Sequence, residues 1–206
     1  MKSRMDNWQK NIKDNALKIS LSLILLIFAL YFNHISSNYT TRVGSSSTTD
    51  IILDNIGPYN LSFIFIWFSV IVVVLFFGYP LIFNPKKLHY SITMFSFFYI
   101  VRSIFISFTH LKAPVDAVVT NFPFFLKELN FSNDLFFSGH TGLPFLGFLI
   151  FEENKLLRYF MLFSSILLGI TVLLMHVHYS IDVFSAFFIT YGIYKIGNWS
   201  LNGFKK

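Results

Sequence analysis

Residues 61–83 read LSFIFIWFSVIVVVLFFGYPLIF, a run without a single charged side chain. About 20 apolar residues are enough for a helix to cross a lipid bilayer. Five other apolar runs of roughly this length occur in the chain, so the sequence predicts an all-α integral membrane protein with six transmembrane helices. The predicted spans are about 16–32, 61–83, 90–108, 135–151, 157–176 and 179–199.

The composition leads to the same class of protein. Hydrophobic residues make up 54% of the chain and charged residues 13%, against roughly 25% charged in an average soluble domain. A soluble fold of 206 residues could not bury 28 phenylalanines together with the other apolar side chains. The length predicts a single membrane domain, 1–206. Because the chain has no cysteine, disulfides and thiol chemistry are excluded.

The basic residues predict an orientation. Their net charge of +6 does not indicate nucleic-acid binding, because they lie between apolar runs and form no single stripe. Cytoplasmic ends of membrane helices are enriched in Lys and Arg, and this predicts cytoplasmic N- and C-termini. Arg42, Lys112 and Lys127 would then lie outside, and Arg102 within a span. The remaining 12 of the 16 would lie inside: Lys2, Arg4, Lys10, Lys13, Lys18, Lys86, Lys87, Lys155, Arg158, Lys195, Lys205 and Lys206.

Two longer segments, 34–60 and 109–134, would be outer loops. The first is rich in Ser, Thr and Asn and predicts a solvated loop. The second carries several aromatic residues and predicts a segment that dips into the lipid interface.

Ionisable side chains inside spans are costly and therefore indicate function. In the predicted topology Arg102 lies about 9 Å from the outer end of its span and His140 about 7 Å. His178 lies at the junction of the last two spans, and Asp182 about 6 Å deeper. These groups therefore share one layer near the outer face.

His178 and Asp182 are spaced i, i+4 and would share one face of a helix. A carboxylate bound to one imidazole nitrogen fixes the tautomer and leaves the other nitrogen to act as a nucleophile or base. The alternative is a purely structural His–Asp pair.

The segment Ser138-Gly139-His140-Thr141 stands near a predicted helix start. Backbone N–H groups at helix N-termini bind anions, and the two hydroxyls and the glycine favour a phosphate site. The alternative is an ordinary helix cap, with Ser138 as the N-cap. Arg102 could clamp phosphate oxygens with its planar guanidinium, or serve as a structural ion pair or a snorkelling side chain.

Two histidines, His176 and His178, could suggest a metal site. No third or fourth ligand stands at a compatible spacing and cysteine is missing, so no metal or other cofactor is predicted. Lys112 is a weaker candidate for phosphate binding and is better explained as a solvated loop charge.

These residues resemble the motifs of the sphingomyelin synthase family, over about residues 50–190. Within the pattern, Thr93 and Met94 replace a pair of arginines, Phe98 replaces a tyrosine, and Ser132-Asn133 replaces Cys-Gly. The matching motifs are Asp134 with Ser138-Gly139-His140-Thr141; His176 with His178-Tyr179-Ser180-Ile181-Asp182-Val183, Ala186, Phe187 and Thr190; Arg102-Ser103-Ile104 with Thr109, Leu111 and Pro114; and Asp50 as a remnant of the first motif. The wider relatives are lipid phosphatases of the type 2 phosphatidic acid phosphatase superfamily.

The resemblance implies a phospholipid headgroup phosphotransferase that works through a phosphohistidine intermediate. His178 would be the nucleophile, Asp182 its orienting group, and His140 the general acid and base. The resemblance further implies that Arg102, Ser138, Gly139 and Thr141 bind the phosphate, with Asp134, His176 and Tyr179 in support.

The expected partners are a phospholipid donor and a lipid hydroxyl acceptor, in a bacterial cell membrane, or in a Golgi or ER membrane if the chain is eukaryotic. Water as the acceptor would give a lipid phosphate phosphatase. A non-catalytic membrane protein is the third hypothesis.

Overall fold

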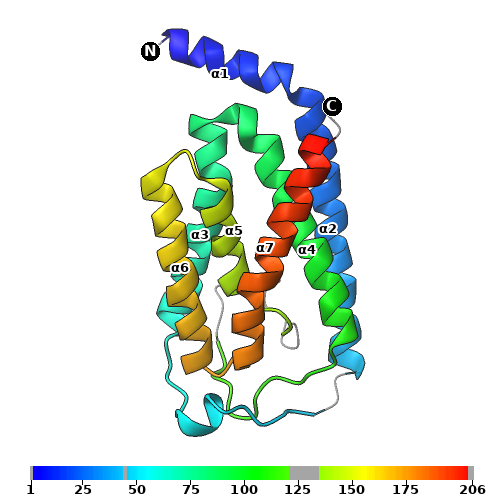
Figure 1. Ribbon diagram of the computed structural model, residues 1–206, viewed down its shortest axis with the longest axis vertical. Helices are drawn as coiled ribbons and strands as arrows, with labels where there is room; N and C mark the ends of the chain where they lie inside the picture. The colour runs from blue at the N-terminus through cyan, green and yellow to red at the C-terminus, as the bar shows by residue number, and fades with distance from the viewer. Residues whose placement is uncertain (1, 44–45, 121–134, 204–206) are drawn as a thin grey trace.

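The computed structural model describes residues 2–43, 46–120 and 135–203. Every regular element in these ranges is helical (Figure 1), which confirms the all-α prediction. The helices are α1 (Lys2–Asp14), α2 (Ala16–Val43), η1 (Leu53–Asn55), α3 (Ser62–Phe83), η2 (Pro85–Lys87), α4 (Leu88–Phe108), α5 (Gly139–Ile150), α6 (Lys155–Leu174) and α7 (Ser180–Gly203).

Helix α5 occupies the middle of the bundle, where it contacts α3, α4, α6 and α7, while α2 packs mainly along α4. Close approach to α5 depends on its glycines. A Cβ on Gly142 would lie 2.8 Å from both the Phe98 ring of α4 and Thr190 Oγ1 of α7. Small residues permit close helix packing in membranes. The short central helix is therefore fixed from several sides.

Within the described residues, four helical segments are long and apolar enough to cross a membrane: α2, α3, the combined 85–108 segment, and α6. Their outward surfaces carry exposed Leu, Ile, Val and Phe side chains, as expected of lipid-facing helices. The chain is therefore a multi-pass membrane protein. Helix α5 has only 12 residues, and α7 contains Asp182 and Lys195. The number of six spans stays a prediction.

Several observed helix boundaries differ from the predicted ones. The first outer loop does not begin at residue 34, because α2 continues to Val43. This stretch contains neither Gly nor Pro, and the Thr40 hydroxyl donates to the carbonyl oxygens of Ser36 and Ser37, so the polar side chains find partners within the helix. The fourth predicted span begins at Gly139 instead of 135, and the fifth ends at Leu174 instead of 176.

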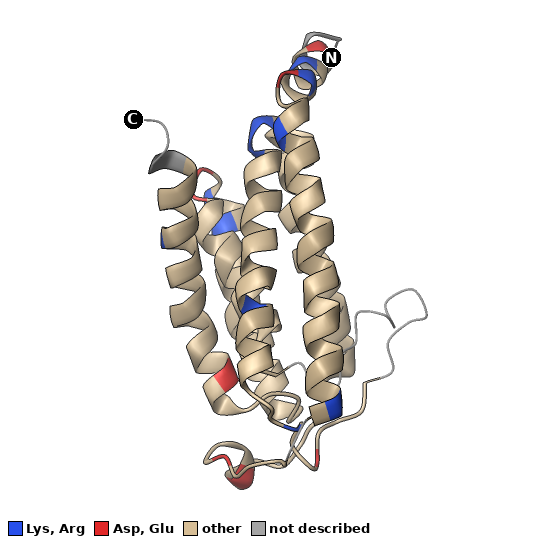
Figure 2. Ribbon diagram, turned by 90° about the vertical axis from the view of Figure 1, so that its right-hand side faces the viewer, with Lys and Arg blue, Asp and Glu red and all other residues tan. Residues whose placement is uncertain are grey.

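The chain begins with α1, an amphipathic helix that lies across the end of the bundle (Figure 1). The Trp8 indole nitrogen donates to the Leu81 carbonyl oxygen at 2.7 Å and fixes this helix against α3. Both termini lie at this end, and Figure 2 shows that most Lys and Arg residues gather there. The opposite end, formed by residues 46–60, 109–120 and 175–179, is called the loop end below.

Candidate active site

The turn between α6 and α7 is held by the long loops of the loop end. Backbone hydrogen bonds join Tyr59 N to Leu174 O at 2.7 Å and Val118 N to Met175 O at 2.9 Å. The Tyr179 hydroxyl donates to the Lys112 carbonyl oxygen at 2.8 Å. These loops thereby fix the short segment that carries His176 and His178.

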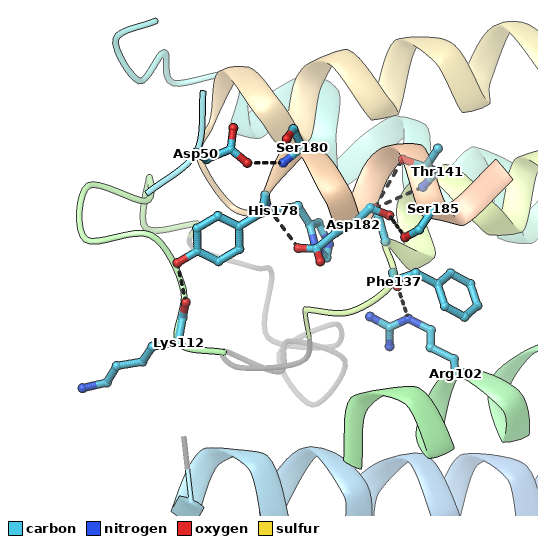
Figure 3. Close-up of polar contacts among 11 residues, drawn as sticks. Asp50, Arg102, Lys112, Phe137, Thr141, His178, Ser180, Asp182 and Ser185 are labelled. Carbon is cyan, nitrogen blue, oxygen red and sulfur yellow. Dashed lines mark hydrogen bonds and ion pairs between the residues drawn. The ribbon is translucent and has the colours of Figure 1, made fainter. Parts of the chain in front are cut away.

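Asp50 ties the first loop directly to the start of α7. Its Oδ2 accepts from the Ser180 backbone N–H at 2.7 Å (Figure 3). Its Oδ1 accepts from the backbone N–H groups of Ile52 and Leu53. Burial alone would raise the pKa of Asp50, but these hydrogen bonds outweigh it and hold the pKa below its ordinary value. A carboxylate at a helix N-terminus also interacts favourably with the helix dipole. Asp50 therefore caps α7 from outside the helix.

His178 and Asp182 lie in contact, as their spacing predicts. His178 Nδ1 is 3.3 Å from Asp182 Oδ2, and that oxygen also accepts from the Tyr179 backbone N–H at 3.0 Å. Asp182 is fully buried and His178 is 4% exposed. Asp182 Oδ1 has no hydrogen-bond partner among the described residues. The contact occupies Nδ1, which leaves Nε2 as the nitrogen for chemistry.

His140 faces this pair from the start of α5. Its ring centroid is 6.0 Å from that of His178 and 4.4 Å from that of Phe65. It is the second residue of α5, whereas the predicted boundary placed it five residues into a span. Its Nδ1 is buried and has no partner among the described residues. The two imidazoles therefore lie next to each other, edge to face.

Ser138 is the N-cap of α5, so the predicted cap exists. Its Oγ accepts from Thr141 N at 3.4 Å and from the Thr141 hydroxyl at 3.3 Å. Its backbone N–H donates to the Asp182 carbonyl oxygen at 2.9 Å. Both side chains are fully buried. They fix the start of α5 against α7, and their predicted phosphate contacts stay a prediction.

Arg102 reaches the same region from the middle of α4. It is 5% exposed, and its Nε donates to the Phe137 carbonyl oxygen at 2.9 Å (Figure 3). A Cβ added to Gly139 would lie 3.2 Å from Arg102 Nε, so the guanidinium lies directly against this glycine. The positive charge is thus placed beside the N-terminus of α5, where an anion would also meet free backbone N–H groups.

His176 makes a second histidine–carboxylate contact, with Nδ1 2.9 Å from Asp116 Oδ2. This contact holds the pKa of the Asp116 carboxyl below its ordinary value. The sequence reasoning missed Asp116, because an isolated carboxylate in a polar loop carries no pattern. The Lys112 side chain points away from Asp182 in Figure 3. Asp134, a predicted supporting residue, lies outside the described residues.

The candidate site thus combines residues from four parts of the chain, near the loop end of a multi-pass membrane protein. They are Arg102 of α4, His140 of α5, His178 of the turn before α7, and Asp182 of α7. Among the described residues, no three His, Cys, Asp or Glu side chains are grouped so that they could hold a metal ion.

Residues 132–199 match the family described as PAP2 superfamily C-terminal. The match covers about a third of the chain and includes His140, His178 and Asp182, but not Arg102 or Asp50. It supports membership of the type 2 phosphatidic acid phosphatase superfamily, and with it a function of the lipid phosphatase or phosphotransferase type. Neither a curated protein nor a solved structure matches the chain significantly.

Proposed function

We propose that the protein is a phospholipid headgroup phosphotransferase that works through a phosphohistidine intermediate at the outer membrane face. The observation that carries the proposal is the pair of imidazoles of His140 and His178, whose ring centroids are 6.0 Å apart. The Asp182 carboxylate contacts Nδ1 of His178. An imidazole oriented by a buried carboxylate is a suitable nucleophile, and a second imidazole can move the proton. The residues of the sphingomyelin synthase-like motifs support the same reading.

In the first step His178 Nε2 attacks the phosphorus of the donor. The new P–N bond forms as the P–O bond to diacylglycerol breaks, and protonated His140 donates its proton to the leaving oxygen. Arg102 and the backbone N–H groups at the start of α5 stabilise the charge on the phosphate oxygens.

In the second step an acceptor attacks the phosphohistidine. Its hydroxyl proton passes to His140, the new P–O bond forms and the P–N bond breaks. A lipid hydroxyl as acceptor gives a transferase. Water as acceptor gives a lipid phosphate phosphatase, which is the second candidate; the superfamily match favours both equally.

The site lies at the end of the bundle opposite the basic cluster (Figure 2). Since cytoplasmic ends are enriched in Lys and Arg, this distribution supports the proposed location of the site on the outer side.

The test uses the full chain purified in detergent with headgroup-labelled phosphatidylcholine or phosphatidylethanolamine, with and without ceramide. Transfer of label to ceramide supports the phosphotransferase. Release of a water-soluble phosphate instead of transfer supports the phosphatase.

The nucleophile assignment has its own test. His178→Ala removes the attacking nitrogen and should abolish both products, whereas His34→Ala, at an exposed position of α2, should leave them unchanged. Acid-labile labelling of the wild-type protein by a phosphoryl-labelled donor should disappear in the same variant. Turnover that survived His178→Ala would exclude the proposed mechanism.

A further inference from the structure

A cavity of about 490 Å³ opens at the loop end, beside the proposed active site. Its walls come from residues 47–48, 53–57 and 114–116, together with His176 and Tyr179. Its volume lies in the range of small-molecule sites. Tyr179 connects it to the active site, because the same residue follows His178 and donates its backbone N–H to Asp182 Oδ2.

The charge in the cavity is opposite to that of the phosphate site. Asp54 and Asp116 contribute carboxylates, and no Lys or Arg is among the described residues that line it. A phosphate group would be repelled here, whereas a cation would be attracted. The phosphate-binding guanidinium of Arg102 does not line this cavity. The two neighbouring spaces therefore suit the two ends of a zwitterionic headgroup.

His176 adds a hydrogen-bond acceptor to the wall. It is 1% exposed, and neither ring nitrogen has a hydrogen-bond partner of good geometry among the described residues, although Nδ1 lies 2.9 Å from Asp116 Oδ2. When Nδ1 donates its proton to Asp116, 2.9 Å away, Nε2 carries a lone pair and can only accept. His176 also has φ 54°, a left-handed backbone conformation that is uncommon for non-glycine residues. A buried unsatisfied acceptor held in this conformation indicates a ligand group with N–H donors.

These features favour a primary ammonium group over a quaternary one. A primary ammonium has three N–H donors for carboxylate and imidazole acceptors. A quaternary ammonium has none and is usually bound by several aromatic faces. Tyr179 is the single aromatic residue apart from His176 among the described residues of the lining.

We propose that this cavity binds the primary ammonium group of a phospholipid headgroup whose phosphate lies at His178, with Asp116 and His176 as specificity-determining residues. This inference rests on the proposed phospholipid phosphotransferase function. It assigns a headgroup chemistry of the ethanolamine type to the donor.

The experiment compares donor selectivity in the full chain in detergent. Phosphatidylethanolamine carries a primary ammonium, phosphatidylcholine a quaternary one, and phosphatidylglycerol none. The wild type should give the highest kcat/KM with phosphatidylethanolamine. Asp116→Asn should lower the ratio of phosphatidylethanolamine to phosphatidylglycerol turnover about tenfold, because a charge-assisted hydrogen bond is lost.

A second variant tests the same proposal in case Asp116→Asn fails to fold. His176→Asn removes the imidazole, yet asparagine tolerates the left-handed backbone, so it should lower the same ratio without a large loss of thermal stability. Asp6→Asn, an identical charge change at an exposed position of α1, is the matched control and should keep the wild-type ratio. Equal turnover of all three lipids by the wild type, or an unchanged ratio in both cavity variants, would overturn the proposal.

A binding measurement separates this inference from the proposed function. In His178→Ala, which cannot form the phosphohistidine, soluble phosphoethanolamine should still raise the melting temperature more than inorganic phosphate does, and Asp116→Asn should remove that difference. If this binding persists but no lipid is turned over, the proposed function fails and the ammonium site stands. Faster turnover of soluble phosphoethanolamine than of phosphatidylethanolamine would overturn the lipid source.

Discussion

At the scale of single residues, Asp182 makes two contacts with one carboxylate oxygen, and the sequence motif alone reveals only one of them. Its Oδ2 contacts His178 Nδ1 and also accepts the Tyr179 backbone N–H, so one oxygen orients the imidazole and closes the turn before α7. Its complete burial makes the contact insensitive to solvent. Asp182 is therefore part of the fold and, in the proposed mechanism, also the residue that positions His178.

Asp182→Asn tests the positioning role. The amide preserves the shape of the side chain but removes its negative charge. That charge fixes the tautomer of the neutral imidazole and stabilises the imidazolium, so kcat should fall about 10²- to 10⁴-fold with little change in KM. Asp14→Asn, at the exposed end of α1, is the control. A higher KM with an unchanged kcat would contradict the orienting role.

Asp50 gives a prediction on pH-dependent stability. Its pKa in the folded state lies below the ordinary value of 3.8, so its carboxylate contributes stability above that pH. This contribution is lost as the pH falls from about 5 through 3.8 toward the lower folded-state pKa.

The corresponding variant is Asp50→Asn, measured by thermal unfolding in detergent between pH 3 and pH 7. At pH 7 its melting temperature should be about 2–4 °C lower than that of the wild type, because a charged hydrogen bond to Ser180 is weakened. Below pH 4 the difference should shrink steadily as the pH approaches the folded-state pKa of Asp50. A difference of the same size at every pH would exclude titration of Asp50 as the cause.

At the scale of elements, the short helix α5 depends on its neighbours. With 12 residues it is marginal by itself. Its first turn is capped by Ser138. The Ser165 hydroxyl of α6 donates to the Thr141 carbonyl oxygen, and Gly142 lies in close contact with α4 and α7. The position of His140 is set by this packing.

Gly142→Ala tests that packing. The added methyl would lie 2.8 Å from the Phe98 ring and from Thr190 Oγ1, and Phe98 is fully buried. We expect a destabilisation of about 1–3 kcal/mol and lower activity through displacement of His140. Gly192→Ala in α7, where no atom lies within 4 Å of the added Cβ, should be neutral or slightly stabilising. The same melting temperature for both variants would show that α5 can move away.

At the scale of the whole molecule, charge is divided between the two ends of the bundle. The amphipathic helix α1 and most basic residues lie at the end that carries the termini, and the proposed site lies at the other (Figures 1 and 2). This division predicts an N-in, C-in orientation with an outward-facing site.

The absence of cysteine makes the orientation directly testable. A single cysteine at Asn55, exposed at the loop end, should react with a membrane-impermeant maleimide in intact cells. A cysteine at Asn7, exposed in α1, should react only after lysis. The reverse pattern would overturn the orientation and move the proposed chemistry to the cytoplasmic face.

The sequence alone determined the helical class and the membrane environment, and it predicted the residues of the candidate active site. Apolar runs of bilayer length permit few structures other than membrane-spanning helices. Ionisable side chains are so costly in lipid that their presence within such runs indicates a functional site. The spacing of His178 and Asp182 predicted their contact because both belong to one helical turn. These conclusions need only local geometry and solvation.

The tertiary structure decided what depends on distant segments. Only packing places Arg102 against Gly139, Asp50 on the first residue of α7, and Asp116 on His176. It also extends α2 to Val43 and shortens the fourth predicted span, since hydrophobicity does not fix where caps and back-bonding hydroxyls end a helix. Contacts between residues far apart in the chain leave no periodic pattern, so the acidic cavity beside His178 became visible only when the loops were folded together.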